Sequence, residues 1–159
     1  MVCSPNPPLA SREVEFTTVT QLPAKDIVRA RAWYKDKLGL DPVRMGGEPF
    51  DSSVFDAEPS NYGLDYDTGT AKCGIYETQH AGRNLATAMR LVTDDFDALH
   101  AYLLSRGVMF EIYDIEENFH EPNGTPYFDN GALISPDGEK TAWFKDSEDN
   151  ILAIGSSWG

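Results

Sequence analysis

Long apolar runs are missing from this sequence of 159 residues. No stretch approaches the roughly 20 apolar residues that a membrane-spanning helix needs. The Pro-rich start, Met1 to Arg12, has neither a basic segment nor an apolar one and does not resemble a signal peptide. We therefore expect a cytoplasmic protein that does not insert into a membrane.

Cysteine and positive charge are also scarce. The two cysteines, Cys3 and Cys73, are too few for a disulfide scaffold, and we expect free thiols in a reducing compartment. Thirteen basic residues face 26 acidic ones, which gives a net charge of -13. A chain this acidic cannot replace the counterions of a phosphate backbone, so nucleic acid is excluded as a partner. A neutral or cationic small ligand is permitted, although acidity also serves solubility alone.

Sequence motifs of the common catalytic types are absent. There is no Gly-x-Ser-x-Gly elbow, no phosphate loop and no Cys-His pairing. The three histidines, His80, His100 and His120, have no paired metal-ligand spacing, and we expect each to be solvated or structural. His120, beside Glu121, is the one with a conceivable role, if its loop folds over a cavity mouth.

One segment occurs twice in altered form. Residues 19–26 and 87–94 are each followed by a helical run that ends at a glycine, and Asp26 to Gly39 has the same spacing as Asp94 to Gly107. Such self-similarity indicates one supersecondary unit used twice. A ligand is then expected between the two copies.

The residue pattern predicts a similar order of elements in each copy. Helices are expected from the cap Asp26 to Gly39, and from Asp94 or Asp95 to Gly107. We predict an α+β fold of two β-α-β-β-β modules that form a curved mixed sheet around a central cleft, with the helices outside. Strands are predicted over 14–22, 61–66, 71–78, 85–92, 108–115, 140–145 and 150–154, short strand-like pieces over 43–70 and a long irregular loop over 116–131. The corresponding division is an arm (1–13), a first module (14–79), a linker (80–84) and a second module (85–159).

Two of these segments resemble a known family. Residues 26–40 are similar to the first-module helix of the vicinal oxygen chelate superfamily, which includes glyoxalase I, bleomycin resistance proteins, fosfomycin resistance enzymes and extradiol dioxygenases. Residues 141–153 resemble its closing hairpin, whose turn usually reads Asp-Pro-Asp-Gly-Asn; here Ser147 and Asp149 replace the Pro and Gly. The resemblance implies paired modules and, commonly, a homodimer. It implies no single activity, because this fold supports many chemistries.

The resemblance also implies positions for a divalent metal. The four ligand positions of the metal-dependent members fall on Val19, Thr87, Ala153 and the strand around Glu77. Val19 and Ala153 have no donor atom, and Thr87 offers only a neutral hydroxyl. Because a stable site needs three or four donors, we predict that the metal site is lost and that no cofactor is bound.

The remaining candidates are apolar and aromatic. Glu77 is a candidate general base, since a carboxylate in an apolar cavity has a raised pKa, although the favoured interpretation is that it points to solvent at the strand end. Core packing explains any single aromatic residue better than ligand binding does. We assign ligand binding to Val19, Gln21, Tyr62, Thr87, Met89, Tyr113, Trp143 and Ala153, with Trp143 expected to face inward.

Three functions are compatible with the sequence. The leading hypothesis is a metal-free protein that holds an aromatic or apolar, conceivably cationic, ligand in the inter-module cleft, as the drug-sequestering members of the family do. The alternative is a lyase or isomerase that uses Glu77, or a metal held by other ligands such as His120 and Glu121. A third hypothesis is a subunit that uses the cleft for a protein partner.

Overall fold

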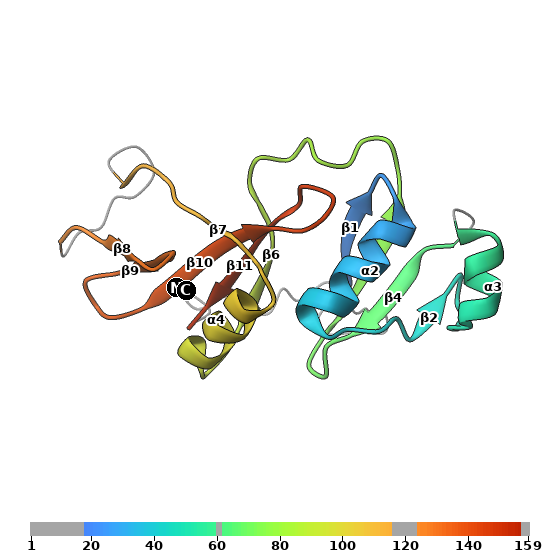
Figure 1. Cartoon of the computed structure of the whole chain (residues 1–159), viewed down its shortest axis with the longest axis horizontal. Coiled ribbons are helices and arrows are strands. Elements are labelled where there is room, and N and C mark those ends of the chain that lie inside the picture. Colours follow the sequence, from blue (N-terminus) through green and yellow to red (C-terminus); the bar gives the residue numbers. More distant parts are fainter. Residues whose placement is uncertain (1–17, 60–61, 116–123, 157–159) are drawn as a thin grey trace, which may run out of the picture.

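The computed structural model describes residues 18–59, 62–115 and 124–156, so Cys3, His120 and Glu121 lie outside the described residues. Within these ranges the chain forms two mixed β-sheets, of five and six strands (Figure 1). The predicted α+β class is therefore confirmed.

The first sheet has the strand order β1-β5-β4-β2-β3 and is accompanied by α2 and α3. Its first strand, β1, is parallel to its last strand, β5, and the other neighbours are antiparallel. The elements are β1 (Thr20–Ala24), α2 (Ile27–Leu38), β2 (Arg44–Met45), β3 (Glu48–Pro49), α3 (Ser52–Ala57), β4 (Leu64–Asp67) and β5 (Lys72–Glu77).

The second sheet repeats this plan with the order β6-β11-β10-β9-β8, and β7 pairs with β10 beside it. Again the first strand is parallel to the last, and the other pairs are antiparallel. The elements are β6 (Thr87–Val92), α4 (Phe96–Ser105), β7 (Phe110–Glu111), β8 (Tyr127–Asp129), β9 (Ala132–Ile134), β10 (Lys140–Lys145) and β11 (Ile151–Gly155). Each half thus contains the strand–helix–strands unit that the internal repeat predicts.

The two main helices begin close to the predicted caps. The Asp26 carboxylate accepts a hydrogen bond from the Arg29 amide at 2.9 Å, and α2 ends at Gly39, whose φ of 67° is left-handed. For α4 the cap is Asp95, which accepts from the Ala98 amide at 3.1 Å. No helix in the described ranges has the length and apolar content needed to cross a bilayer.

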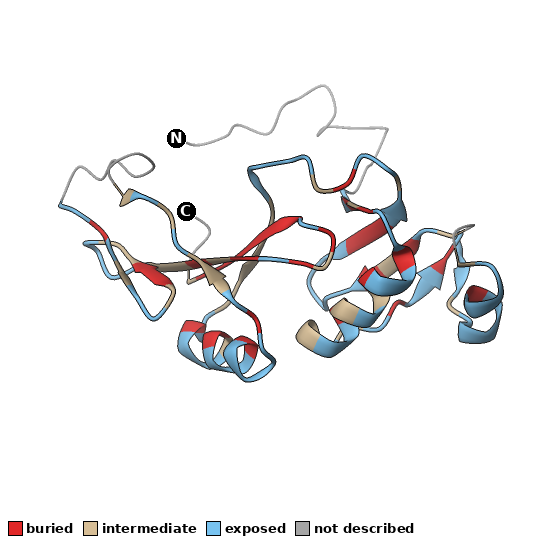
Figure 2. Ribbon diagram, turned by 45° about the horizontal axis from the view of Figure 1, so that its top comes forward, coloured by how far each residue is buried: buried red, intermediate tan, exposed pale blue. Residues whose placement is uncertain are grey.

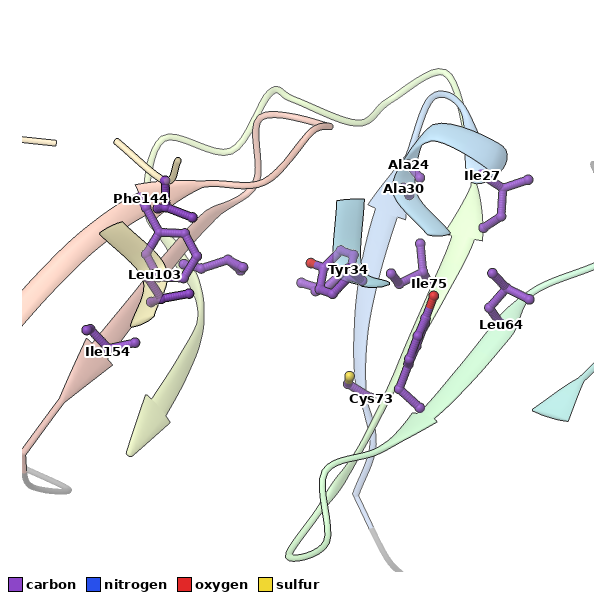
Figure 3. Close-up of a cluster of buried hydrophobic side chains, with 14 of the residues drawn as sticks. Ala24, Ile27, Ala30, Tyr34, Leu64, Cys73, Ile75, Leu103, Phe144 and Ile154 are labelled. Atoms are coloured by element: carbon purple, nitrogen blue, oxygen red, sulfur yellow. The ribbon is translucent and has the colours of Figure 1, made fainter. Parts of the chain in front are cut away.

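Both main helices lie on the same side of the sheets, and the core forms between helices and sheets (Figure 2). One buried apolar cluster contains side chains from both halves, part of which is drawn in Figure 3. The rings of Trp33 and Phe144 stack at 6.2 Å, and the rings of Tyr34 and Tyr66 lie 5.8 Å apart. Helix α2 therefore packs on both sheets and makes them share one core.

The turn between β10 and β11 joins the two halves through buried polar groups. Asp146 accepts a hydrogen bond from the Tyr34 hydroxyl at 2.8 Å, and Asn150 donates to the Pro23 carbonyl at 2.9 Å. The other carboxylate oxygen of Asp146 accepts the Glu148 and Asn150 amides, which fixes the turn. Burial raises the pKa of Asp146, and its hydrogen bonds from Asn150 and Tyr34 oppose that rise.

Glu148 ties the same turn to the start of α2. Its carboxylate, whose side chain is 1% exposed, accepts the Lys25 and Asp26 amides at 2.9 Å and the Arg29 guanidinium at 2.8 Å and 2.9 Å. Negative charge at a helix N-terminus is favourable. Burial alone would raise the pKa of Glu148, but the hydrogen bonds from Arg29, Asp26 and Ser147 together hold it below its ordinary value.

Some predicted elements were wrong. Residues 43–70 contain the helix α3 as well as the expected short strands; Asp51 caps it by accepting the Ser53 amide at 2.9 Å. The predicted irregular loop over 116–131 includes β8, which forms a hairpin with β9. Its two turn residues, Asn130 and Gly131, have φ of 48° and 83°, as an Asn-Gly hairpin turn requires. The predicted strand over 108–115 is reduced to β7, because only two of its residues pair with β10.

His100 is structural, as expected from the sequence. Its ring lies 4.5 Å from Phe110 and 5.6 Å from Phe96, stacked on both. Burial lowers the pKa of His100, and a hydrogen bond with Asn130 opposes this only in part. The folded protein therefore favours the neutral imidazole. His80, by contrast, is exposed.

Replacing Glu148 with Gln is expected to lower the free energy of unfolding by about 2 kcal/mol, because charge-assisted hydrogen bonds to a buried carboxylate are lost. Urea denaturation followed by circular dichroism measures the change. The matched control is Asp149→Asn in the same turn, where the side chain is exposed and a φ of 65° suits Asn. If both variants lose the same stability, the turn does not join the halves through Glu148.

Stability is expected to fall as the pH drops below the ordinary histidine pKa of 6.5, because the unfolded chain then binds a proton at His100 that the folded chain resists. Above that pH the contribution is fully present. Thermal unfolding between about pH 7.5 and about pH 5.5 measures it. His100→Gln should flatten this dependence, whereas His80→Gln should leave it unchanged; equal slopes in all three proteins would contradict the assignment.

Candidate functional site

A cavity of about 340 Å³ lies at the seam between the two sheets, and we refer to it as the seam cavity. The strands β1 and β6 are the facing edges of the sheets at this seam (Figure 1). A more polar depression of about 400 Å³ adjoins it at the β4–β5 turn. The seam cavity is lined by Thr20, Thr68, Thr70, Ala71, Lys72, Cys73, Met89, Arg90, Leu91 and Val92.

Each sheet has an open face, which is the face opposite α2 and α4. Because side chains alternate along a strand, the buried Leu22 and Ala24 place Gln21 and Val19 on the open face of the first sheet. Gln21 pairs with Gly74, and its side-chain amide lies 2.7 Å from where a Gly74 Cβ would be. Only glycine therefore lets Gln21 lie flat across β5 without moving.

Four of the predicted ligand-binding residues lie together on the open face of the second sheet. The indole N–H of Trp143 donates to the Thr87 hydroxyl at 3.2 Å, and the Tyr113 ring meets the Trp143 ring edge-on at 5.6 Å. Ala153 is the cross-strand partner of Trp143. Burial raises the pKa of the Tyr113 hydroxyl, and the nearby Glu111 carboxylate adds to this. An aromatic wall with two hydroxyl groups, those of Thr87 and Tyr113, is thus present.

Glu77 and Tyr62 lie elsewhere. The Glu77 carboxylate accepts the Ile27 amide at 3.1 Å at the start of α2, on the helix side of the first sheet. Tyr62 packs its ring over Gly46 at the β2–β3 turn, 3.2 Å from where a Cβ would be. Neither residue lines the seam cavity. Of the predicted ligand-binding residues, Met89 is the one that lines it.

The donor set does not fit the metal site that the family resemblance implies. Val19 and Ala153 carry no donor atom, and the Thr87 hydroxyl is engaged by Trp143. Within residues 18–59, 62–115 and 124–156, no three His, Cys, Asp or Glu side chains are grouped so that they could hold a metal ion. A stable divalent site needs such a group.

Arg90 and Lys72 are site residues that the sequence interpretation missed. Arg90 lies on β6 between apolar neighbours, and its guanidinium crosses β11 over Gly155. Its Nη2 is 3.5 Å from the Thr141 hydroxyl, and its Nε is buried with no hydrogen-bond partner among the described residues. The signal available in the sequence was a basic residue inside the apolar run Ala-Met-Arg-Leu-Val.

Comparisons with known proteins identify the fold. No family model matches the chain, and no curated protein sequence matches it. Among solved structures, a glyoxalase/bleomycin resistance protein from Catenulispora acidiphila is 18% identical, with a TM-score of 0.59 over 90% of this chain and 99% of that one. A lactoylglutathione lyase from Agrobacterium tumefaciens is 16% identical (TM-score 0.57, 92% and 98% covered). A bleomycin-binding protein complexed with bleomycin is 15% identical (TM-score 0.58, 90% and 99%). The chain has the fold of these structures, so the predicted resemblance to the vicinal oxygen chelate superfamily is confirmed at the level of fold.

Thr87→Val should shift one of the three indole N–H resonances in the amide NMR spectrum, because the Trp143 N–H loses its acceptor. The loss of stability should be about 1 kcal/mol or less, as for a single neutral hydrogen bond. Thr141→Val, on the next strand but one, is the control and should leave the indole resonances in place. An unchanged indole spectrum in Thr87→Val would show that this contact does not form.

Proposed function

We propose that this chain, which has the fold of the vicinal oxygen chelate superfamily, is a small-molecule-binding protein that holds an apolar or aromatic ligand in the seam cavity without a metal ion. The observation that carries the proposal is the seam cavity itself, formed by both halves of the chain. Its volume of about 340 Å³ is at the lower end of the range for ligand pockets, about 300–1,000 Å³. The ligand is accordingly small.

The lining suits a ligand with one apolar side. Met89 and Leu91 contribute apolar side chains from β6, and Thr20, Thr68 and Thr70 line the cavity from the first half of the chain. Arg90, Ala153 and Trp143 form one cross-strand row on β6, β11 and β10, so the aromatic wall lies about 10 Å from Arg90 at ordinary strand spacing. A longer ligand therefore reaches from the cavity to Trp143.

Metal-free binding is proposed from the chemistry of the family positions. The metal-dependent chemistry of the superfamily requires donors where this chain has Val19 and Ala153. The chain instead resembles, in fold, a protein whose structure is complexed with bleomycin. Sequestration of a drug or another toxic small molecule is the role we propose, and it predicts recovery of the ligand unchanged after binding.

The enzymatic alternative is a lyase or isomerase. One structure with the same fold is described as a lactoylglutathione lyase. Its proposed base, Glu77, is bonded to the Ile27 amide and is not among the residues that line the seam cavity. No described contact therefore favours Glu77 as a catalytic group over its role at the start of α2. We keep binding as the proposed function.

We further propose a cytoplasmic homodimer. The family resemblance is the reason for the dimer, and the second half exposes apolar side chains that a second copy could cover, among them Leu85, Met109 and Ile112. Cys73 is a free, buried thiol whose pKa is raised by burial, as suits a protein of a reducing compartment.

Ala71→Phe is the test of the proposed site. Ala71 is exposed on the β4–β5 turn and lines the seam cavity, so a phenyl group there fills the cavity while the backbone hydrogen bond between Thr68 and Ala71 remains. Ligands that raise the melting temperature of the parent protein should no longer do so in the variant. Because no metal ion takes part, the ligand-induced rise in the melting temperature of the parent protein should persist in excess chelator.

Ala86→Phe is the matched control, since Ala86 is also exposed but lies outside the lining. It should keep the thermal shift. If ligands raise the melting temperature of Ala71→Phe as much as that of the control, they bind outside the seam cavity. A shift abolished by chelator would overturn the metal-free proposal, and chemical conversion of the bound ligand would favour the enzymatic alternative.

A further inference from the structure

We propose that the ligand of the seam cavity carries an anionic oxygen group, a carboxylate or a phosphonate, which Arg90 binds with support from Lys72. This inference rests on the proposed function and names the chemical class of its ligand. It runs against the net charge of -13, which by itself would favour a cation.

The first reason is the state of the Arg90 side chain. Its Nε is buried and has no hydrogen-bond partner in the described ranges, where the side chain makes only the long 3.5 Å approach of Nη2 to the Thr141 hydroxyl. A buried donor without an acceptor is costly, and more so when it carries charge. The Nε–H and one Nη–H of a guanidinium form a fork that matches a carboxylate or phosphonate in two parallel hydrogen bonds.

The second reason is that Arg90 is held in place. Its guanidinium lies over Gly155 so closely that a Cβ at residue 155 would be 2.7 Å from Cζ and from Nε. Glycine at this position therefore gives the guanidinium room to lie against β11. A side chain that crosses a neighbouring strand in this way has given up much of its freedom before any ligand binds, which favours affinity.

The third reason is the charge of the lining. Lys72 and Arg90 both line the seam cavity, and no Asp or Glu is among its described lining residues. The nearest acidic residue along β4, Asp67, is the cross-strand partner of Lys72, but its carboxylate accepts the Gly69 amide at 2.8 Å. Nothing anionic among the described lining residues therefore neutralises the cavity.

The ion pairs of the described residues give a further reason. Seven lysine and arginine side chains in the described ranges form ion pairs with acidic residues. Acidic residues outnumber basic ones by 26 to 13, so each basic residue has many possible acidic partners in this chain. Neither Lys72 nor Arg90 belongs to an ion pair within the described ranges, and both line one cavity.

The experiment uses probes that share one aromatic body and differ in charge: naphthoate, naphthylphosphonate, the neutral naphthamide and the cationic naphthylmethylammonium. Binding to the full chain is measured by calorimetry at low salt. We expect the two anions to bind about tenfold or more tightly than the amide, since a charge-assisted fork is worth at least that factor. The cation should bind most weakly.

Three variants separate recognition from folding. Arg90→Met replaces the guanidinium with an apolar chain and should bring the anions to the affinity of the amide, while the melting temperature without ligand stays the same or rises. Gly155→Ala keeps Arg90 but forces it to move and should weaken anion binding alone. The control is Arg83→Gln in the exposed linker, which should change neither affinity nor melting temperature.

The outcomes are distinct. Equal affinity for the anions and the amide, or unchanged anion binding in Arg90→Met, would overturn the anionic assignment and leave the proposed binding function standing. Absence of binding by all four probes would count against the proposed function itself. A lowered melting temperature in Arg90→Met with unchanged selectivity would show that Arg90 is structural.

Discussion

The buried polar turn between β10 and β11 is the contact on which the rest of this structure depends. Asp146 and Glu148 place two carboxylates in the interior, and each accepts hydrogen bonds from the other half: Asp146 from the Tyr34 hydroxyl, and Glu148 from the Lys25 and Asp26 amides just before α2. Burying such groups is costly unless every oxygen finds donors in suitable geometry. The observed arrangement of the two sheets supplies these donors, and the same arrangement creates the shared core around Tyr34.

The repeated unit produces two different contacts between the halves of the chain. At one, the β10–β11 turn sits against the end of β1 and fills the space with hydrogen bonds, including Asn150 to Pro23. At the corresponding place in the other half, the β4–β5 turn faces β6, and its residues line a cavity of about 340 Å³ instead. Its short threonine and alanine side chains do not reach across as Glu148 does. A structural joint and a binding site thus come from one supersecondary unit.

Much of the fold could be predicted because its signals are local. Asp26 and Gly39 bound α2 by capping and by a left-handed backbone, both of which depend on a few neighbouring residues. The missed β8–β9 hairpin also had a local signal, the dipeptide Asn130-Gly131, which is typical of a two-residue hairpin turn. The length of β7 had none, since it is set by how many of its residues meet β10, a contact between distant parts of the chain.

For the site, the sequence by itself determined what is absent: Val19 and Ala153 offer no metal donor, whatever their surroundings. It also predicted Thr87, Tyr113 and Trp143 as ligand-binding residues, but it did not show that their side chains touch. The folded arrangement alone shows that Glu77 binds the start of α2 and that Arg90 lies over Gly155 with its Nε lacking a partner among the described residues. Side-chain type is fixed by the sequence, but whether a charge meets a partner, a helix end or a cavity depends on which distant strands the fold brings beside it.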